Sequence, residues 1–371
     1  MRRRCILHVG VPKTGTTHLQ DVLWGSTPQL REQGFRMAMG SVDDHFFLTL
    51  ALRTRLDPAV DSPEALDVVR RLRRDVHSSR PEHLIVSHEL LAPVSQGHID
   101  ELMDLLGDLE VHVVVTARDL ARQIPAEWQQ QVKTRAQAPY FRFVDRVVSG
   151  QNDAFWSAQD LAAVAGRWGR GLPPERVHIV TVPPAGSPRE VLLARFCDAV
   201  GLSPDGLNLE RARLNESIGF EQTELLRRVN IALGDRLPHV RSGYGGTVKF
   251  GFAEQVLAQQ VARQRLRLPQ QYWGWCIGAA KEMVVHLEHA GYAVHGDLDD
   301  LIPHPAGAAE PYRPTDAEVA AAAVEAIATM LDEQHSRELR AGRRHHVMEG
   351  AARLTRGVRR SVGRAARRIG A

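Results

Sequence analysis

The segment that most limits the fold of this chain lies near its start, where a strand pattern leads through a short turn into a helix pattern. Residues 5–11 (CILHVGV) are apolar enough for a buried strand, and residues 17–24 place apolar side chains on one helix face. The turn between them reads PKTG. Backbone N–H groups of such a turn and of the following helix start point toward one spot and favour an anion there. A glycine-containing turn without a ligand is the alternative interpretation.

Strand and helix patterns alternate along the first 200 residues. Further strands are predicted at 83–87, 111–116 and 177–182, and helices at 63–74, 99–106, 120–132 and 189–200. Such alternation is typical of a parallel sheet with helices on both faces. We therefore expect an α/β fold, a P-loop-like parallel sheet flanked by helices, with a helical C-terminal part.

The second half of the chain looks helical. Strand patterns end at about residue 205, and helices are predicted at 221–233, 253–266 and 278–291. The Thr315-Asp-Ala-Glu318 segment has the spelling of a capping box. We assign the chain to a P-loop domain (1–300), a Pro/Ala/Gly linker (301–314), a helix (315–340) and a basic tail, amphipathic or flexible (341–371).

Positive charge is concentrated at the C-terminal end. The net charge is +3, and the eleven Arg and two Glu from Arg337 onward give +9, so the rest of the chain carries −6. Apolar residues recur in the tail in steps of three and four, which suits a peripheral contact with an anionic membrane surface. A solvated tail is the alternative, and without interleaved aromatic residues we expect no nucleic acid partner.

Composition narrows the class of protein further. No apolar run has the ~20 residues that a membrane span needs, and the N-terminus lacks a signal-peptide pattern. Three cysteines lie too far apart in sequence to suggest a metal site, which favours free thiols in a reducing compartment. We expect a cytoplasmic protein, with peripheral membrane contact as an option. Only four of the 47 cationic residues are lysines, which draws attention to Lys13 and Lys249.

The turn differs from the phosphate-binding loop of an ATPase. Lys13 precedes Gly15 instead of following a glycine, and the strand 111–116 runs into Ala117 and Arg118 rather than ending in an Asp that would hold magnesium. We therefore expect an anion to be bound without a metal, with the help of an arginine from later in the sheet.

At this turn the chain resembles the sulfotransferases of bacterial, actinobacterial type that use 3′-phosphoadenosine 5′-phosphosulfate (PAPS). Their 5′-phosphosulfate loop has the form Pro-Lys-x-Gly-Thr-Thr, and the resemblance extends loosely over residues 5 to about 300. It implies that the donor is bound by Pro12, Lys13, Thr14, Gly15, Thr16 and Thr17. It also implies that Lys13 lies at the bridging and leaving oxygens, where a preplaced cation stabilises the charge that grows during transfer.

A second segment is similar to the family's 3′-phosphate segment, in which an arginine ends a strand. Residues 111–120 (VHVVVTARDL) match it and imply that Arg118 binds that phosphate. The serine that usually follows eight residues later is Ala126 here, and Gln123, Trp128 or Gln129 are candidates to replace it. A surface salt bridge is the alternative for Arg118.

A third match is thinner. Residues 241–249 (RSGYGGTVK) are similar to a late Gly-rich segment of the cytosolic branch that closes over the 3′-phosphate and adenine. The resemblance implies that Arg241 and Gly243 contact the donor, and a Gly-rich loop between two cations is a reasonable phosphate clamp. A loop without a ligand is the alternative interpretation.

Transfer to a hydroxyl needs a base near the attacking oxygen. His88 and Glu89 follow the strand 83–87, at the place where the cytosolic branch has its catalytic histidine and other branches use a carboxylate. Neighbours on an extended segment face opposite sides, so we expect only one of the pair to face the acceptor. His45, expected on a loop, is a third candidate, and a structural histidine is the alternative for each.

The sequence thus predicts an enzyme that transfers a sulfuryl group from PAPS to a hydroxyl of a carbohydrate, a lipid or a secondary metabolite, without a metal. One alternative is a P-loop phosphotransferase (kinase) that uses ATP, in which Asp43 or Asp44 would hold magnesium. The other is a non-catalytic, membrane-associated nucleotide-binding module.

Overall fold

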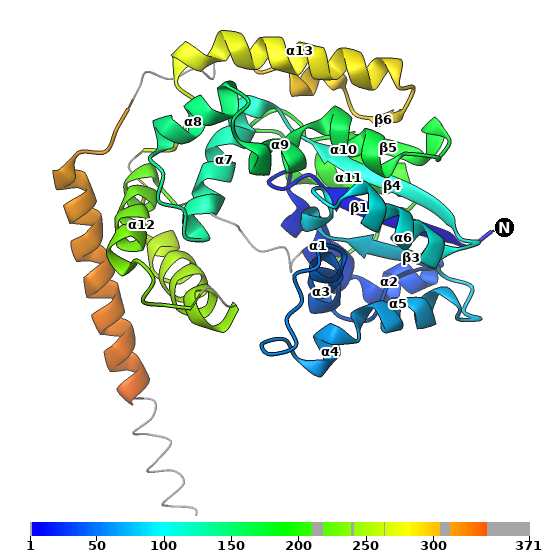
Figure 1. Ribbon diagram of the computed structural model, residues 1–371, viewed down its shortest axis with the longest axis horizontal. Helices are drawn as coiled ribbons and strands as arrows, with labels where there is room; N and C mark the ends of the chain where they lie inside the picture. Colours follow the sequence, from blue (N-terminus) through cyan, green and yellow to red (C-terminus); the bar gives the residue numbers. More distant parts are fainter. Residues whose placement is uncertain (1, 210–217, 239–240, 263, 305–311, 340–371) are drawn as a thin grey trace, which may run out of the picture.

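A six-stranded, fully parallel sheet forms the centre of the protein (Figure 1). The computed structural model describes residues 2–209, 218–238, 241–262, 264–304 and 312–339. The strands are β1 (Arg4–Gly10), β2 (Phe35–Met37), β3 (His83–Ser87), β4 (Glu110–Ala117), β5 (Val177–Thr181) and β6 (Ala293–His295), in the order β2-β3-β1-β4-β5-β6. The predicted α/β sheet is confirmed, and β1 lies between β3 and β4, where the strand order reverses.

Two of the strands were not predicted. β2 and β6 have three residues each, too few for an alternating or continuous apolar pattern to stand out from the background. The prediction that strands end at about residue 205 is therefore wrong, because β6 pairs in parallel with β5 at the sheet edge.

Helices cover both faces of the sheet. They are α1 (Thr16–Gly25), α2 (Thr27–Glu32), α3 (Val42–Leu52), α4 (Pro63–Leu66), α5 (Val68–Val76), α6 (Gln96–Leu106), α7 (Leu120–Lys133), α8 (Tyr140–Val148), α9 (Asp153–Gln159), α10 (Leu161–Trp168), α11 (Arg189–Val200), α12 (Phe220–Leu233) and α13 (Trp273–His289). Short 3₁₀ turns are η1 (Glu89–Leu91), η2 (Pro174–Arg176), η4 (Leu257–Gln259), η5 (Gln270–Tyr272) and η6 (Leu298–Leu301), and η3 (Arg241–Glu254) is a π-helix.

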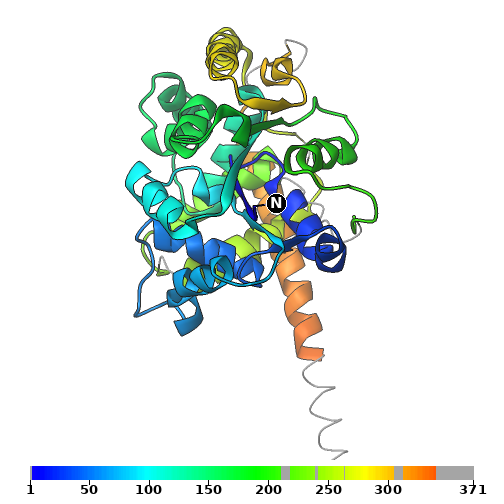
Figure 2. The same ribbon diagram turned by 90° about the vertical axis from the view of Figure 1, so that its right-hand side faces the viewer.

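Alternating side chains of β1 enter two separate cores. Ile6 joins the core formed with α1, α2 and α11, whereas Cys5, Leu7 and Val9 join the larger core on the other face. Figure 2 shows α1 and α11 on one side of the sheet and most other helices on the opposite side. The continuous burial of β1 explains why its sequence is apolar throughout rather than alternating.

The cysteines Cys5, Cys197 and Cys276 are unpaired and buried. Burial raises the pKa of the Cys5 and Cys197 thiols to about 12, so both are structural rather than reactive. Within the part of the chain that the structure describes, no helix combines the length and the hydropathy needed to cross a bilayer.

The C-terminal part is helical, as expected. A helix over 316–339 begins at a capping box, in which Thr315 Oγ1 accepts from the Glu318 N–H at 3.2 Å and Glu318 Oε2 accepts from the Thr315 N–H at 2.8 Å. It packs through Val319, Ala322 and Ala326 against the larger core. Residues 305–311 of the predicted linker and the predicted basic tail, 341–371, lie outside the described residues.

The predicted helix at 253–266 is wrong. The π-helix η3 ends at Glu254, and only the single turn η4 follows before the chain leaves helical geometry. Its apolar residues Ala253, Val256 and Leu257 are nevertheless buried in the larger core. The spacing of apolar residues in this segment therefore predicted their burial correctly. It did not predict a helix correctly, because a short turn can bury residues at the same spacing.

Candidate functional site

Three chain segments that carry predicted site residues meet at one edge of the sheet. Gly10, Ser87 and Ala117 end β1, β3 and β4, which are adjacent parallel strands. The turn after β1, the pair that follows β3 and Arg118 after β4 therefore leave the sheet side by side. In open α/β sheets, this carboxyl edge next to the reversal of strand order is where ligands bind.

The turn after β1 has a backbone that exposes the start of α1. Lys13 and Gly15 have φ angles of 67° and 85°, in the left-handed region. Gly15 is the N-cap of α1 and supplies no capping side chain, so the first amide N–H groups of the helix have no side-chain acceptor. A Cβ atom at Gly15 would lie only 2.6 Å from Leu192 Cδ2, which explains a glycine here.

A buried network of polar side chains from the ends of β1, β3 and β4 holds this turn in place. Thr116 Oγ1 lies 2.5 Å from Thr14 Oγ1, donates to the Gly10 carbonyl at 3.0 Å and lies 3.2 Å from His8 Nε2. The other ring nitrogen of His8 is 2.7 Å from Ser87 Oγ. Burial lowers the pKa of His8 to about 4, so its ring is neutral. The Thr14 hydroxyl is thus turned into the protein, where it holds the turn rather than facing an anion.

Among the residues that the structure describes, the Lys13 ammonium makes one hydrogen bond. Its Nζ donates to Gln130 Oε1 of α7 at 2.6 Å. Burial lowers the pKa of Lys13 below 10.5, the nearby charges of Lys133 and Lys249 lower it further, and Glu127 opposes the shift. Three of the four lysines in an arginine-rich chain therefore stand close enough to influence one another.

Arg118 lies directly beneath the backbone of the turn. Its Nη1 donates to the Lys13 carbonyl at 2.9 Å. Burial lowers its pKa to about 10, so the guanidinium keeps its charge at neutral pH. The buried Nε has no hydrogen-bond partner among the described residues. A buried donor without an acceptor costs about 1–3 kcal/mol, which a bound anion would remove.

The helix α7 supplies further contacts to the turn. Ala126 lies on it, and of the three candidates to replace the missing serine only Gln123 reaches the turn, where its Nε2 donates to the Pro12 carbonyl. Trp128 and Gln129 donate to main-chain oxygens elsewhere. Gln123 is thus the one candidate placed to position the turn.

His88 and Glu89 lie on the same side of the chain. β3 ends at Ser87 and the turn η1 begins at Glu89, so the backbone does not stay extended across the pair. His88 Nδ1 accepts from the Leu90 N–H at 3.1 Å and lies 3.7 Å from Glu89 Oε2. The expectation of opposite faces is therefore wrong, because it assumed an extended segment.

Glu89 connects the pair to the start of α1. Its Oε2 accepts from Thr16 Oγ1 at 3.4 Å and from Gln20 Nε2 at 3.3 Å. Burial alone would raise the pKa of Glu89, but His88, Gln20 and Lys13 together lower it below its ordinary value. Glu89 is therefore ionised at neutral pH, and burial, which lowers the pKa of His88, keeps that ring neutral.

His45 is placed in the core rather than on a loop. It belongs to the first turn of α3, whose N-cap Ser41 accepts from the Asp44 N–H at 3.2 Å. Its Nδ1 accepts from the Ser87 N–H at 3.1 Å and its Nε2 donates to the Ala38 carbonyl at 3.0 Å. Both ring nitrogens are used and the side chain has no solvent exposure, so His45 lies out of reach of an acceptor.

The acidic residues considered for magnesium are arranged differently. Asp44 forms an ion pair with Arg71, and Asp43 is exposed at the start of α3. Among the described residues, no group of three or more His, Cys, Asp or Glu side chains is arranged to hold a metal ion.

The Gly-rich segment 241–249 is the first part of the π-helix η3, not an open loop. Arg241 begins η3, and a Cβ atom at Gly243 would lie 2.7 Å from the Pro238 carbonyl oxygen. The Lys249 ammonium lies 4.9 Å from the Phe250 ring centre, and its charge lowers the pKa values of His88 and Lys13. Lys249 therefore stands toward the His88–Glu89 side of the site.

Several residues of the site were not predicted from the sequence, among them Gln20, Thr116, Glu127 and Gln130. Gln20 follows Thr16 by one helical turn, and Gln130 follows Glu127 by three positions, so each pair shares a helix face. That spacing was a usable signal, whereas nothing in the sequence told which face of α7 would meet the turn.

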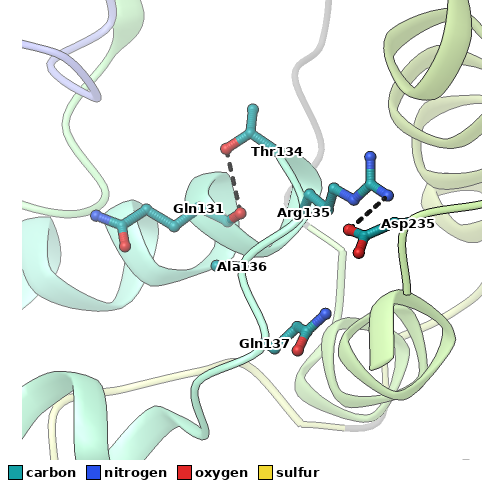
Figure 3. A pocket seen from close by; sticks show the side chains of 6 residues that line it. All are labelled: Gln131, Thr134, Arg135, Ala136, Gln137 and Asp235. Carbon is teal, nitrogen blue, oxygen red and sulfur yellow. Dashed lines mark hydrogen bonds and ion pairs between the residues drawn. The ribbon is translucent and has the colours of Figure 1, made fainter. Parts of the chain in front are cut away.

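A hollow of about 400 Å³ lies at the end of α7, outside this site. Figure 3 shows Arg135 pointing toward Asp235 across it. Arg135 donates to the Leu237 carbonyl at 2.7 Å and to the Gly234 carbonyl. Since its guanidinium is already bonded to main-chain oxygens, we interpret Arg135 as a tie between α7 and the segment after α12.

Comparisons with known proteins find distant structural neighbours and no match in sequence. No family model matches the chain, and no curated protein matches its sequence. A sulfotransferase from Alicyclobacillus acidocaldarius is similar in structure, with 13% identity and a TM-score of 0.36 over 64% of this chain and 96% of that one. A sulfotransferase domain from the curacin biosynthetic pathway has 12% identity and a TM-score of 0.31, over 56% and 76% of the two chains.

Proposed function

We propose that this chain is a PAPS-dependent sulfotransferase that transfers a sulfuryl group to a hydroxyl of a carbohydrate, a lipid or a secondary metabolite. The observation that carries the proposal is the contact between the anion-binding turn and a carboxylate. Thr16 Oγ1, in the first turn of α1, donates to Glu89 Oε2 at 3.4 Å. The charge of Lys13 contributes to lowering the pKa of Glu89. A site for an anionic donor and a base for an acceptor hydroxyl thus adjoin.

The residues present suit a donor with two anionic ends. The uncapped start of α1 and the Lys13 ammonium offer donors to the phosphosulfate end. Arg118 keeps a buried Nε–H without a partner among the described residues, directly beside the turn. A guanidinium with an unused donor in that place fits a phosphate oxygen.

The proposed step is an in-line displacement at sulfur. Glu89 takes the proton of the acceptor hydroxyl as the acceptor oxygen forms its bond to sulfur. The bond from sulfur to the bridging oxygen breaks, and its electron pair remains on the leaving phosphate. Lys13 stabilises the charge that develops there, and 3′-phosphoadenosine 5′-phosphate leaves with a sulfate ester as the other product.

Hydrogen bonding favours Glu89 over His88 as the base. His88 Nδ1 accepts from the Leu90 N–H, so the neutral ring carries its proton on Nε2. A nitrogen that already bears a proton cannot take one from an acceptor. Glu89 is an ionised carboxylate with open lone pairs, and His88 is left to position it or to donate to the acceptor oxygen.

Calorimetry tests the donor. We expect 3′-phosphoadenosine 5′-phosphate to bind more tightly than Mg-ATP, and Lys13→Met to weaken that binding. Lys281→Met is the matched control, because Lys281 is exposed on α13. Tighter binding of Mg-ATP would replace the proposal by the phosphotransferase alternative.

Product formation tests the reaction. The chain is incubated with PAPS labelled on sulfur and with separate carbohydrate, lipid and secondary-metabolite extracts, and the labelled ester is sought by chromatography. We expect label in at least one extract, and about 1% of it or less with Glu89→Gln. Binding of the nucleotide without any labelled product would favour the non-catalytic module.

A further inference from the structure

A chain of three histidines between two carboxylates runs across β4, β5 and β6, away from the candidate site. His112 Nε2 lies 3.1 Å from Glu110 Oε1, and His112 Nδ1 lies 2.9 Å from His178 Nε2. His178 Nδ1 lies 3.1 Å from His295 Nε2, and His295 Nδ1 lies 2.6 Å from Asp198 Oδ2. All six ring nitrogens therefore take part in one row of four hydrogen bonds.

The row requires one proton more than three neutral rings can supply. Each bond needs one N–H, and a neutral imidazole carries one N–H. The carboxylates at both ends only accept when ionised. Three neutral rings therefore satisfy three bonds, and the fourth bond is made only when one ring is an imidazolium.

We propose that this histidine chain is a proton-binding site that holds one proton among its three rings and fastens the edge strand β6 to the sheet. With that proton all four bonds form, whichever ring carries the charge. His178, in the middle, is 7% exposed, and burial together with its histidine neighbours lowers its pKa to about 4. Each end ring, His112 or His295, faces a carboxylate oxygen, whereas His178 faces only ring nitrogens.

Charged groups on the neighbouring elements act on Glu110, and Arg4 also disfavours a positive charge on His178. Arg176 of η2 lies 3.5 Å from Glu110 Oε2, and Arg4 of β1 and His83 of β3 are close enough for their charges to interact across the strands. α11 contributes Asp198. The hydrogen bond with His112, helped by the charges of Arg176 and Arg4, lowers the pKa of Glu110 and preserves this carboxylate as an acceptor.

The site matters most to β6. This strand has three residues at the sheet edge, so its backbone ladder is short. The segment after it is tied separately, since Arg195 Nη1 lies 2.6 Å from Asp300 Oδ2. Loss of the proton leaves one of the four bonds unmade, and two of the four hold β6, one to β5 and one to α11.

Nuclear magnetic resonance of the full chain with ¹⁵N-labelled histidine tests the proton count directly. We expect the ring ¹⁵N signals of the row to report four N–H protons in total at about pH 7.5, one more than three neutral rings carry. Three rings that titrate independently near pH 6.5, or three rings that are all neutral at that pH, would overturn the proposal.

Stability against pH gives a second test that does not depend on resonance assignment. A proton held in the folded state above its unfolded pKa contributes fully below about pH 6.5, and its contribution is lost as pH rises through the folded value. Between the unfolded and the folded pKa, loss of this proton raises the unfolding equilibrium constant, measured in urea, by up to about tenfold per pH unit.

A matched pair of variants tests whether this pH dependence comes from the histidine chain. In His295→Gln the amide can donate to His178, so two neutral rings complete the shortened row and no extra proton is needed. We expect this variant to lose the excess pH slope, and His289→Gln, on the exposed face of α13, to keep it. Equal slopes in wild type and His295→Gln would contradict a stored proton.

Discussion

Two regions of the sheet use the same residue types in opposite ways. In the row that crosses β4, β5 and β6, His112, His178 and His295 have both ring nitrogens bonded. At the carboxyl end, His88 is bonded within the described chain through Nδ1 alone, and the Lys13 ammonium rests on one glutamine. Saturated polar groups fix a structure, whereas partly buried groups with unused bonding capacity are suited to a ligand.

The largest expected effect comes from removing the charge of Lys13, the cation at the carboxyl end of the sheet. We expect Lys13→Met to lower kcat by about 10²–10³ or more, since the leaving phosphate loses its preplaced charge. The folded stability should change little, because one contact to Gln130 is lost. Turnover of labelled PAPS and urea unfolding measure the two effects. Unchanged turnover would mean that Lys13 is not at the reacting atoms.

The next test separates the two members of the acid–histidine pair. We expect Glu89→Gln to lower kcat by about 10²–10⁴, the usual worth of a general base. His88→Asn should cost far less, because the Asn oxygen can still accept from the Leu90 N–H. Single-turnover rates give both values. A larger loss in His88→Asn would reverse the assignment of the base.

A third substitution removes a hydrogen-bond partner from the buried network that holds the turn. Thr116→Val has the same shape but removes the partner of His8 and Thr14, which should cost about 1–3 kcal/mol of stability and weaken nucleotide binding about tenfold. Thr116→Ser should restore both properties. Thr49→Val, which removes a buried hydroxyl within α3, should lower stability without changing nucleotide affinity, as unfolding and calorimetry would show.

The smallest expected effect concerns pH. Lys13 must be protonated, so the rate should fall as pH rises through its pKa, which burial sets below 10.5. Lys249→Gln removes a charge that lowers this pKa, so the upper limb of the pH–rate profile should move to higher pH by up to about one unit. Lys281→Gln should leave the profile in place. A shift to lower pH would show that Lys249 does not act on Lys13 through its charge.

Long, strongly apolar elements of the fold were predictable. The helix at 189–200 coincides with α11, and the strands at 83–87 and 111–116 match β3 and β4 within a residue. The short strands β2 and β6 were missed because three residues carry too little pattern. The helix α3 was missed although Ser41 before Asp44 is a capping signal, because its apolar residues do not keep to one face.

The meeting of the candidate site residues was predictable where they follow strand ends. The turn at Pro12, the His88–Glu89 pair and Arg118 meet because adjacent parallel strands deliver them to one edge. The inward rotation of the Thr14 hydroxyl and the contact of Gln130 with Lys13 depend on how helices pack and on backbone angles. A single sequence contains no local signal for either.

The fit of Gly10 against Glu89 has a consequence for altering the acceptor. A Cβ atom at Gly10 would lie 3.0 Å from the Glu89 Cα, so the two main chains are in van der Waals contact. In the proposed enzyme, the main chain that leads into the donor turn is thus held directly against the main chain that carries the base. Libraries that vary Phe46 and Phe250 at the periphery can therefore change acceptor preference while the reacting groups keep their separation.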